Sequence, residues 1–351
     1  MRAHRGLEQG LIVTRQALHC GRLEQVERVF GDRGAVQLGI DGDGQVELWR
    51  SGITLEDCRQ VTVRGLILRQ SPASSVVMGA GCRDCVIDAC TFAACGVIEG
   101  GVTLWLGTGT SGCTVSGCAF DMLGAMGRRH LKRDQHCYDI AIMCAQDDCT
   151  GHRFLGNRIV QYSYGIQLGV RGDCREPGRH EVRGNRIEHP WADGIHLKQG
   201  DNLVEENVII GATRVAMSSR AGMRNRFRSN TVLDGYLGLR LRGPDHEVVG
   251  NRFERCRRAA ISLEAAKPGG DGFAAENVLV TDNDCIDCGG ADAVAGEATP
   301  ECAGIVQLSP LPQRLGANRI VGAGAALCTM MPGIDVQLSN GRGLVHPVHR
   351  G

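Results

Sequence analysis

The sequence predicts an all-β protein, a single-stranded right-handed parallel β-helix of about ten coils. Three observations predict this fold: a short strand motif that recurs about every 22 residues, glycine at 50 of 351 positions, and aromatic residues at only 4%. Frequent glycine suits many tight turns, and scarce aromatics suit a narrow core of small aliphatic side chains. A unit of this length cannot bury its own apolar face. Successive units must therefore stack and enclose one continuous core.

The repeat is clearest where a short alternating strand ends at an asparagine and a second strand follows. The asparagines from Asn185 to Asn251 are 22, 23 and 21 residues apart. Asparagine tolerates the left-handed conformation of a sharp bend, and its amide can bond the amides of the coils above and below. We therefore expect a column formed by Asn157, Asn185, Asn207, Asn230, Asn251 and Asn283. A second column of bend residues precedes it by five positions, at His180, Asn202, Asn225 and His246.

Two other repeat architectures fit the sequence less well. A leucine-rich horseshoe needs leucine at fixed offsets and a helix in each repeat, and the sequence has neither. A propeller blade needs about 40 residues, nearly twice the spacing found here. The repeat therefore favours the β-helix.

The regularity of the spacing predicts the domain organisation. Residues 46–340 are expected to form the β-helix, and residues 1–45, which fit the repeat poorly, a cap or irregular first coils. Residues 341–351 are expected to be a C-terminal tail. Longer gaps between repeats predict loop insertions near 121–145, 265–278 and 289–303.

Overall composition narrows the classes of partner. Lys+Arg and Asp+Glu are equal at 39 each, so no global field draws the chain to nucleic acid or to a membrane surface. No apolar stretch approaches the roughly 18 residues that span a bilayer. No secretory signal is visible, and an odd count of 17 cysteines favours reduced thiols and a cytoplasmic location. The sequence does not predict the oligomeric state.

Two Cys-x-x-Cys motifs, Cys82 to Cys85 and Cys285 to Cys288, raise the possibility of zinc. In a β-helix about eight coils separate them, roughly 40 Å by strand spacing, so they cannot share one ion. Small buried bend residues explain them better, and we expect no metal. No nucleotide-binding or hydrolase motif is present, and no cofactor is expected.

A candidate site emerges when the strands that follow the asparagine coils are aligned. Alternation sends Ile166, Ile195, Ala216, Leu239 and Ile261 inward. The first outward column then holds Gln167, His196, Met217, Arg240 and Ser262. The column beside it holds Gly169, Lys198, Ser219, Arg242 and Glu264. Arg220 follows its strand directly, Arg171 lies in the corresponding turn of its own coil, and Asp193 precedes the His196 strand.

The cations His196, Lys198, Arg220, Arg240 and Arg242 would thus cluster on three adjacent coils, within about 10 Å along the axis. A flat, basic sheet face suits a long anionic ligand such as a uronic-acid polysaccharide. The alternative is that these side chains are ordinary solvated residues, since lysine and arginine are common on outward strand faces.

Part of this region resembles the alginate lyase/chondroitinase B family of polysaccharide lyases. The resemblance covers about 40 residues, and its segments are Ser218–Ala221, Asn230–Thr231, Leu241–Gly243 and Val248–Phe253. It implies a pectate-lyase-like solenoid that cleaves uronate polysaccharides by β-elimination. It also implies that Arg220 takes the position of the family's lysine base, and Arg242 that of the arginine at the leaving oxygen.

Two of the departures from the family bear on the expected chemistry. Arginine is a poor general base because its pKa lies above about 12, so Lys198, one coil earlier, is the alternative base. Thr213 and Val215 occupy positions where the family places acidic calcium ligands, so calcium is not expected.

The sequence therefore predicts a carbohydrate-active enzyme that acts on an acidic polysaccharide by β-elimination or C5 epimerisation. Its predicted catalytic residues are Lys198, Arg220 and Arg242. Its predicted substrate-binding residues are His196, Arg240, Gln167, Arg171 and Asp193. Two alternatives stay open: a non-catalytic β-helix that binds glycan or protein, and a cytosolic isomerase or cyclase for a small molecule.

Overall fold

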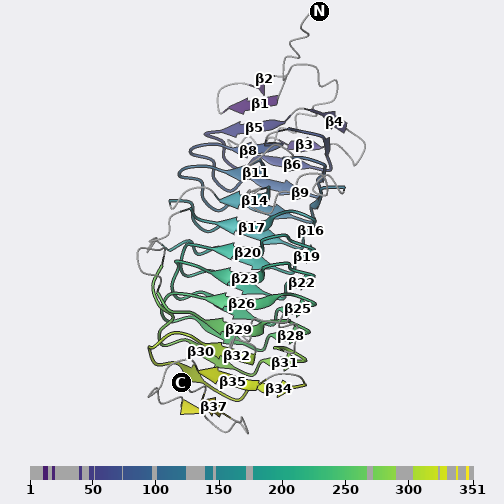
Figure 1. Cartoon of the computed structure of the whole chain (residues 1–351). Coiled ribbons are helices and arrows are strands. Elements are labelled where there is room, and N and C mark those ends of the chain that lie inside the picture. Colours follow the sequence, from purple (N-terminus) through teal and green to yellow (C-terminus); the bar gives the residue numbers. More distant parts are fainter. Residues whose placement is uncertain are drawn as a thin grey trace, which may run out of the picture.

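The chain folds into a right-handed parallel β-helix, as predicted (Figure 1). The computed structural model describes residues 11–14, 18–19, 39–41, 47–50, 52–72, 74–96, 101–123, 139–144, 148–170, 177–266, 272–289, 303–322, 325–329, 337–338 and 345–347. Three sheets run along the rod, and no helix occurs within these ranges. Among these residues there is accordingly no helical segment of the length and apolarity that a membrane span requires.

Sheet A has 14 strands, and its neighbours are parallel except for the first pair. Figure 1 shows its strands β5 to β35 one below another along the rod. In sheet order the strands are β2 (Leu18–His19), β1 (Leu11–Thr14), β5 (Ile53–Glu56), β8 (Val76–Met78), β11 (Val102–Leu106), β14 (Ile140–Cys144), β17 (Tyr164–Leu168), β20 (Asp193–Leu197), β23 (Val215–Ser219), β26 (Leu237–Leu241), β29 (Ala259–Leu263), β32 (Ala303–Gln307), β35 (Ala325–Thr329) and β37 (Val345–Pro347).

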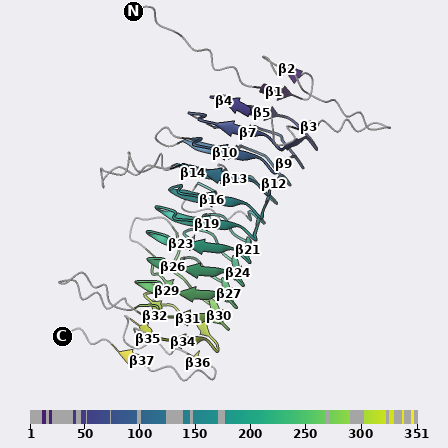
Figure 2. The same ribbon diagram turned by 90° about the vertical axis from the view of Figure 1, so that its right-hand side faces the viewer.

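Sheets B and C complete each coil with strands of two or three residues (Figure 2). Sheet B contains β3 (Gly39–Asp41), β6 (Thr62–Arg64), β9 (Val86–Asp88), β12 (Thr114–Ser116), β15 (Arg153–Leu155), β18 (Glu181–Arg183), β21 (Leu203–Glu205), β24 (Arg226–Arg228), β27 (Glu247–Val249), β30 (Leu279–Thr281), β33 (Arg314–Leu315) and β36 (Gln337–Leu338). Sheet C contains β4 (Glu47–Trp49), β7 (Ile67–Arg69), β10 (Thr91–Ala93), β13 (Ala119–Asp121), β16 (Arg158–Val160), β19 (Arg186–Glu188), β22 (Val208–Ile210), β25 (Thr231–Leu233), β28 (Arg252–Glu254), β31 (Asp284–Ile286) and β34 (Arg319–Val321).

Most of the insertions expected near 121–145 and 289–303, and residues 267–271 of the one expected near 265–278, lie outside the described residues. The same holds for most of residues 1–45 and 341–351. The division into cap, rod and tail therefore stays a prediction.

The asparagine column forms a continuous ladder inside the rod. Asn207 Oδ1 accepts hydrogen bonds from the backbone N–H and the Nδ2 of Asn185, both at 2.9 Å. Asn207 Nδ2 donates to the Val182 carbonyl at 2.8 Å and to Asn230 Oδ1 at 2.9 Å. The predicted amide-to-amide bonding is thus confirmed, but the predicted backbone conformation is wrong. The residue before each asparagine adopts the left-handed conformation, for example Glu206 at φ 56°.

The second column, at the bend before sheet B, is also confirmed and begins one coil earlier, at His152. Each side chain accepts a backbone N–H from the preceding coil: His180 Nδ1 from His152, Asn202 Oδ1 from His180, and His246 Nδ1 from Asn225. The histidine ladder, as we call His152, His180 and His246, is almost completely buried.

Cysteines fill small inward positions of the core, mainly in the N-terminal half of the rod. The twelve cysteines whose side chains the structure describes are all buried, and no disulfide joins them. Cys85 and Cys118 lie at bends and direct their thiols at backbone carbonyls of their own and neighbouring coils. This arrangement matches the predicted role as small buried bend residues.

The five-residue strands of sheet A do not alternate regularly. A Cβ added to Gly194, at the second strand position, would lie 2.6 Å from the Ala216 carbonyl oxygen and 3.0 Å from Cγ2 of Ile209 in the core. The next residue, Ile195, is also part of the core. Because two consecutive positions face inward, the first and the fourth positions of the strand both face outward. This irregularity places Asp193 and His196 on the same outer surface.

Candidate functional site

The outer face of sheet A carries polar side chains in two adjacent columns. The fourth strand positions pair in register as Gln167, His196, Ser218, Arg240 and Ser262. Directly after the strands, parallel backbone hydrogen bonds align Lys198, Arg220, Arg242 and Glu264. We call these four residues the charged column.

This register corrects the sequence alignment of one coil. Met217 was expected to face outward beside His196, but it pairs with Ile195 and Leu239 and lies in the core. Ser218 takes the outward position instead, and Ser219 does not lie beside Lys198. The misalignment arose because this coil has small residues at consecutive positions. The spacing of the sequence alone did not show which of them is equivalent to Gly194. The correction brings Arg220 between Lys198 and Arg242.

Two predicted residues at the upper end of the columns make local contacts. Lys198 is partly exposed, and its Nζ donates a hydrogen bond of 2.6 Å to the Val170 carbonyl. Gln167 is 8% exposed and donates through Nε2 to the Gly169 carbonyl at 3.3 Å. The predicted binding residue Arg171 lies outside the described residues.

At the lower end, Glu264 joins the two columns. Its Oε1 accepts a bond of 3.0 Å from Arg240 Nε, and its Oε2 accepts one of 2.8 Å from Arg242 Nη2. The Arg242 side chain is only 5% exposed and the Arg240 side chain 24% exposed. Arg242 Nε is buried and has no hydrogen-bond partner among the described residues. The sequence alignment placed Glu264 among the outward residues but did not identify it as the partner of both arginines.

Asp193, His196 and Ser218 form a compact hydrogen-bonded triad on the same face, with exposed fractions of 1 to 3%. His196 Nδ1 lies 2.7 Å from Asp193 Oδ2 and 2.8 Å from Ser218 Oγ, and Ser218 Oγ donates to Asp193 Oδ2 at 2.7 Å. The other carboxylate oxygen, Oδ1, accepts from Arg214 Nε at 2.9 Å. Arg214 also donates to the Tyr164 hydroxyl at 2.9 Å, and the Tyr164 ring packs edge-on against His196 at 5.5 Å.

Electrostatics fix the charge state of this triad. Burial by itself raises the pKa of Asp193, but hydrogen bonds from His196 and Ser218 and the charge of Arg214 hold it well below its usual range. Burial lowers the pKa of His196, the nearby charges of Lys198 and Arg214 lower it further, and Asp193 offsets this only in part. The site therefore holds an ionised Asp193 beside a neutral imidazole at neutral pH.

Sequence reasoning had selected Asp193 and His196 separately but missed Ser218, Arg214 and Tyr164. The Asp-x-x-His spacing was the available signal. In a regular strand, however, residues three apart face opposite sides, so the signal had no meaning without the irregularity at Gly194.

One cluster has the residue types of a soft-metal site. The ligand atoms of Cys144, Cys149 and His152, all buried, lie within 4.8 Å of one another. His152 Nδ1, however, accepts the Cys113 N–H at 3.1 Å, so the neutral ring carries its proton on Nε2, which lies 3.1 Å from Thr110 Oγ1. Both ring nitrogens are thus engaged, and we assign the cluster to core packing.

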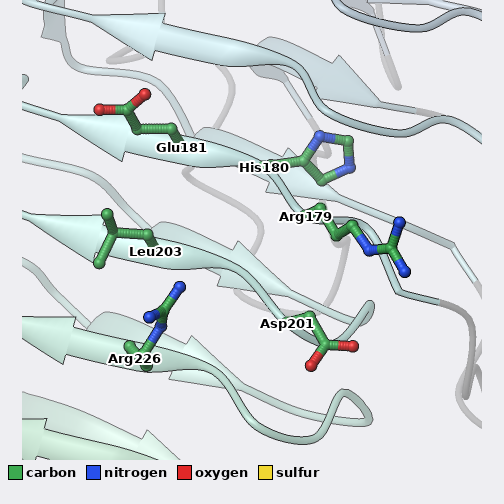
Figure 3. Close-up of a pocket in the computed structure, with 6 residues that line it drawn as sticks. All are labelled: Arg179, His180, Glu181, Asp201, Leu203 and Arg226. Carbon is green, nitrogen blue, oxygen red and sulfur yellow. The ribbon is translucent and has the colours of Figure 1, made fainter.

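A surface hollow of ≈ 580 Å³ lies away from this chemistry, on sheet B and the bend before it (Figure 3). Its lining residues are Arg179, His180, Glu181, Asp201, Leu203 and Arg226. His180 belongs to the histidine ladder, and Asp201 pairs with Arg224 at 2.7 Å. Because its two most reactive groups already have structural partners, we place the candidate site on sheet A instead.

Fold and site together define a parallel β-helix protein with a charged, hydrogen-bonded cluster on one sheet face. A family model described as a right-handed beta helix region matches residues 173–306, which include this cluster. A search of curated proteins returned no match.

Solved structures share the fold at low sequence identity. A tailspike protein of the E. coli bacteriophage HK620 has a TM-score of 0.57 at 12% identity, covering 87% of this chain and 59% of the tailspike chain. The alginate lyase AlyF-OU02 has a TM-score of 0.52 at 13% identity, covering 87% of this chain and 78% of the lyase. PfbA, a surface adhesin of Streptococcus pneumoniae, has a TM-score of 0.55 at 10% identity, covering 83% and 82%. Likeness at this level concerns the fold alone.

Proposed function

We propose that the chain binds a uronate-containing polysaccharide along the outer face of sheet A and acts on it by β-elimination or C5 epimerisation. The observation that carries this proposal is the charged column, in which Lys198, Arg220 and Arg242 follow one another on three successive coils. Neighbouring strands are roughly 4.8 Å apart, so the three cations lie within about 10 Å along the rod.

The local charge supports an anionic ligand. This face carries five cations and two carboxylates: Lys198, Arg214, Arg220, Arg240 and Arg242, with Asp193 and Glu264. The chain as a whole is neutral, with 39 basic and 39 acidic residues, so this surplus is a property of one face. Such a patch concentrates a polyanion and orients its carboxylates. An alginate lyase, and a tailspike solved with a pentasaccharide, are built on the same fold.

Both reactions begin with removal of the C5 proton, which is acidified by the adjacent carboxylate. In elimination the C5–H electrons form the C4=C5 double bond, the C4–O bond breaks, and the leaving oxygen takes a proton. In epimerisation a proton returns to the opposite face of C5. Fixed cations stabilise the enolate-like charge that develops on the carboxylate. In this proposal the positive charges of Arg220 and Arg242 stabilise the enolate-like carboxylate, and Arg240 and Lys198 bind neighbouring carboxylates of the polysaccharide. Because the Lys198 ammonium donates to a carbonyl, it suits binding better than proton abstraction.

The test is turnover of alginate, chondroitin and pectate, followed by ultraviolet absorbance of the unsaturated product and by deuterium exchange at C5. We expect the double variant Lys198→Ala/Arg220→Ala to lose about 10-fold to 100-fold in kcat/KM, because two fixed cations leave the site. Arg183→Ala is the matched control, since Arg183 is an exposed cation on β18 of sheet B. Equal activity of the double variant and the control would contradict the assignment.

A non-catalytic glycan-binding module is the second candidate, and two exposed aromatic residues favour it. Trp191, ahead of β20, is 43% exposed, and Tyr236, ahead of β26, is 38% exposed. Flat rings of this kind stack against sugars. This candidate predicts glycan binding without product or exchange, and about a tenfold loss of affinity in Trp191→Ala/Tyr236→Ala by calorimetry.

A further inference from the structure

Among the four buried histidines that the structure describes, His196 differs from the other three in its tautomer. In the histidine ladder, each Nδ1 accepts a backbone N–H, so each neutral ring carries its proton on Nε2. That proton is donated inside the protein, as from His246 Nε2 to the Arg242 carbonyl at 2.9 Å. The ladder histidines therefore have no lone pair to offer a substrate.

In His196 the roles of the two ring nitrogens are reversed. Its Nδ1 faces a carboxylate, which can only accept, so Nδ1 carries the proton and donates it to Asp193. The Ser218 hydroxyl directs its own proton to the same carboxylate and cannot donate to Nδ1 at the same time. Nε2 is therefore the unprotonated nitrogen, and no described residue hydrogen-bonds to it. His196 is also the one of the four that stands on the outer face of sheet A, beside the charged column.

We infer that Nε2 of His196 is the atom that accepts the substrate's C5 proton, with Asp193 as the positioning residue that fixes the ring and its tautomer. This inference rests on the proposed function and names the base that the reaction requires. Ser218 and Arg214 hold the Asp193 carboxylate from two sides, and the Tyr164 ring edge limits rotation of the imidazole.

The His196 imidazole takes up the proton that leaves C5 and later gives one proton to the leaving oxygen. The C5–H bond breaks and the Nε2–H bond forms, which leaves an imidazolium whose charge Asp193 neutralises. The C5 electron pair forms the C4=C5 bond as the C4–O bond breaks. The imidazolium then gives its proton to the leaving glycosidic oxygen, which restores the neutral ring. The titratable groups around His196 are Asp193, Arg214, Lys198 and Tyr164.

The experiment compares wild type with His196→Gln and Asp193→Asn on whichever of the three glycans is turned over. We expect His196→Gln to lower kcat by about 100-fold or more while glycan affinity measured by calorimetry stays within about threefold. Asp193→Asn should lower kcat and move the acid limb of the kcat profile to lower pH, a shift that a purely structural role would not produce. His189→Gln is the matched control, because His189 is an exposed histidine after β19.

The outcomes separate the two proposals. No product and no exchange with wild type on any of the glycans would overturn the proposed function. If the wild type turns over a glycan and the His196→Gln variant keeps the same kcat, only the assignment of the base is overturned. An independent readout is nitrogen NMR of the histidine rings at pH 7. A proton found on Nε2 of His196 would contradict the inference, and a proton on Nδ1 would support it.

Discussion

Lowering the pH from 7 to 5 is expected to remove several kcal/mol of stability, because the histidine ladder is folded in its neutral form. Burial lowers the pKa of His152 to about 3, and that of His180 and His246 to about 4, from 6.5 in an unfolded chain. Below pH 6.5 the unfolded chain binds protons that the folded chain cannot, so the free energy of unfolding falls as pH falls. The contribution is fully present above about pH 6.5.

Three such protons give a maximal slope of roughly 4 kcal/mol per pH unit, and we expect a loss of about 5 kcal/mol between pH 7 and pH 5. His196, whose pKa burial also lowers, acts in the same direction. The carboxylates with lowered pKa values, such as Glu188, start from 4.5 or below and titrate at lower pH. The window between pH 7 and pH 5 therefore reports on histidines.

Denaturant titration at each pH measures this effect, and the ladder itself supplies the variants. Asn202 and Asn225 occupy equivalent positions in other coils, and each accepts the backbone N–H of the column residue one coil earlier, from His180 and Asn202 respectively. His180→Asn and His246→Asn should therefore fold and lose part of the pH dependence. The comparison variant is His189→Asn, which replaces an exposed histidine outside the ladder. A free energy of unfolding that is unchanged between pH 7 and pH 5 would show that the ladder does not stay neutral in the fold.

Replacing Asn207 by leucine is expected to have the second large effect, a loss of about 3 to 5 kcal/mol of stability. Asn207 is fully buried, and the change leaves the Asn185 N–H without a partner inside the rod and removes the side-chain hydrogen bonds to the Val182 carbonyl and to Asn230 Oδ1. Each buried group left unsatisfied costs about 1–3 kcal/mol. The substitution of Asn207 also interrupts the amide ladder to Asn230, so the loss of stability is not confined to one coil.

The control for this variant is Glu206→Gln at the same bend. Glu206 is exposed, and its ion pair with Arg183 lies on the surface, where solvent screens such pairs and they contribute little to stability. The two proteins are compared by thermal unfolding at pH 7. Equal midpoints for the two variants would mean that the ladder contributes nothing beyond filling space.

Much of the geometry of the candidate site could be predicted from the sequence, because residues separated by one repeat length lie next to each other on neighbouring coils of the rod. The 21- to 23-residue spacing was enough to expect Lys198, Arg220 and Arg242 on neighbouring coils of one face. Spacing did not reveal that Ser218, rather than Met217, stands beside His196. Strand register follows from packing and backbone pairing, and a shift of one residue turns each side chain to the opposite face.

The sequence by itself determined the solenoid, the two bend columns and the basic face, since each depends only on residue types recurring at a fixed period. Only the tertiary structure decided how that face is bonded internally. Asp193 meets His196 because the strand is irregular at Gly194, and Arg240 and Arg242 share Glu264 because neighbouring coils place them within reach. A hydrogen bond forms or fails over a few tenths of an ångström, and periodicity along a chain carries no information at that scale.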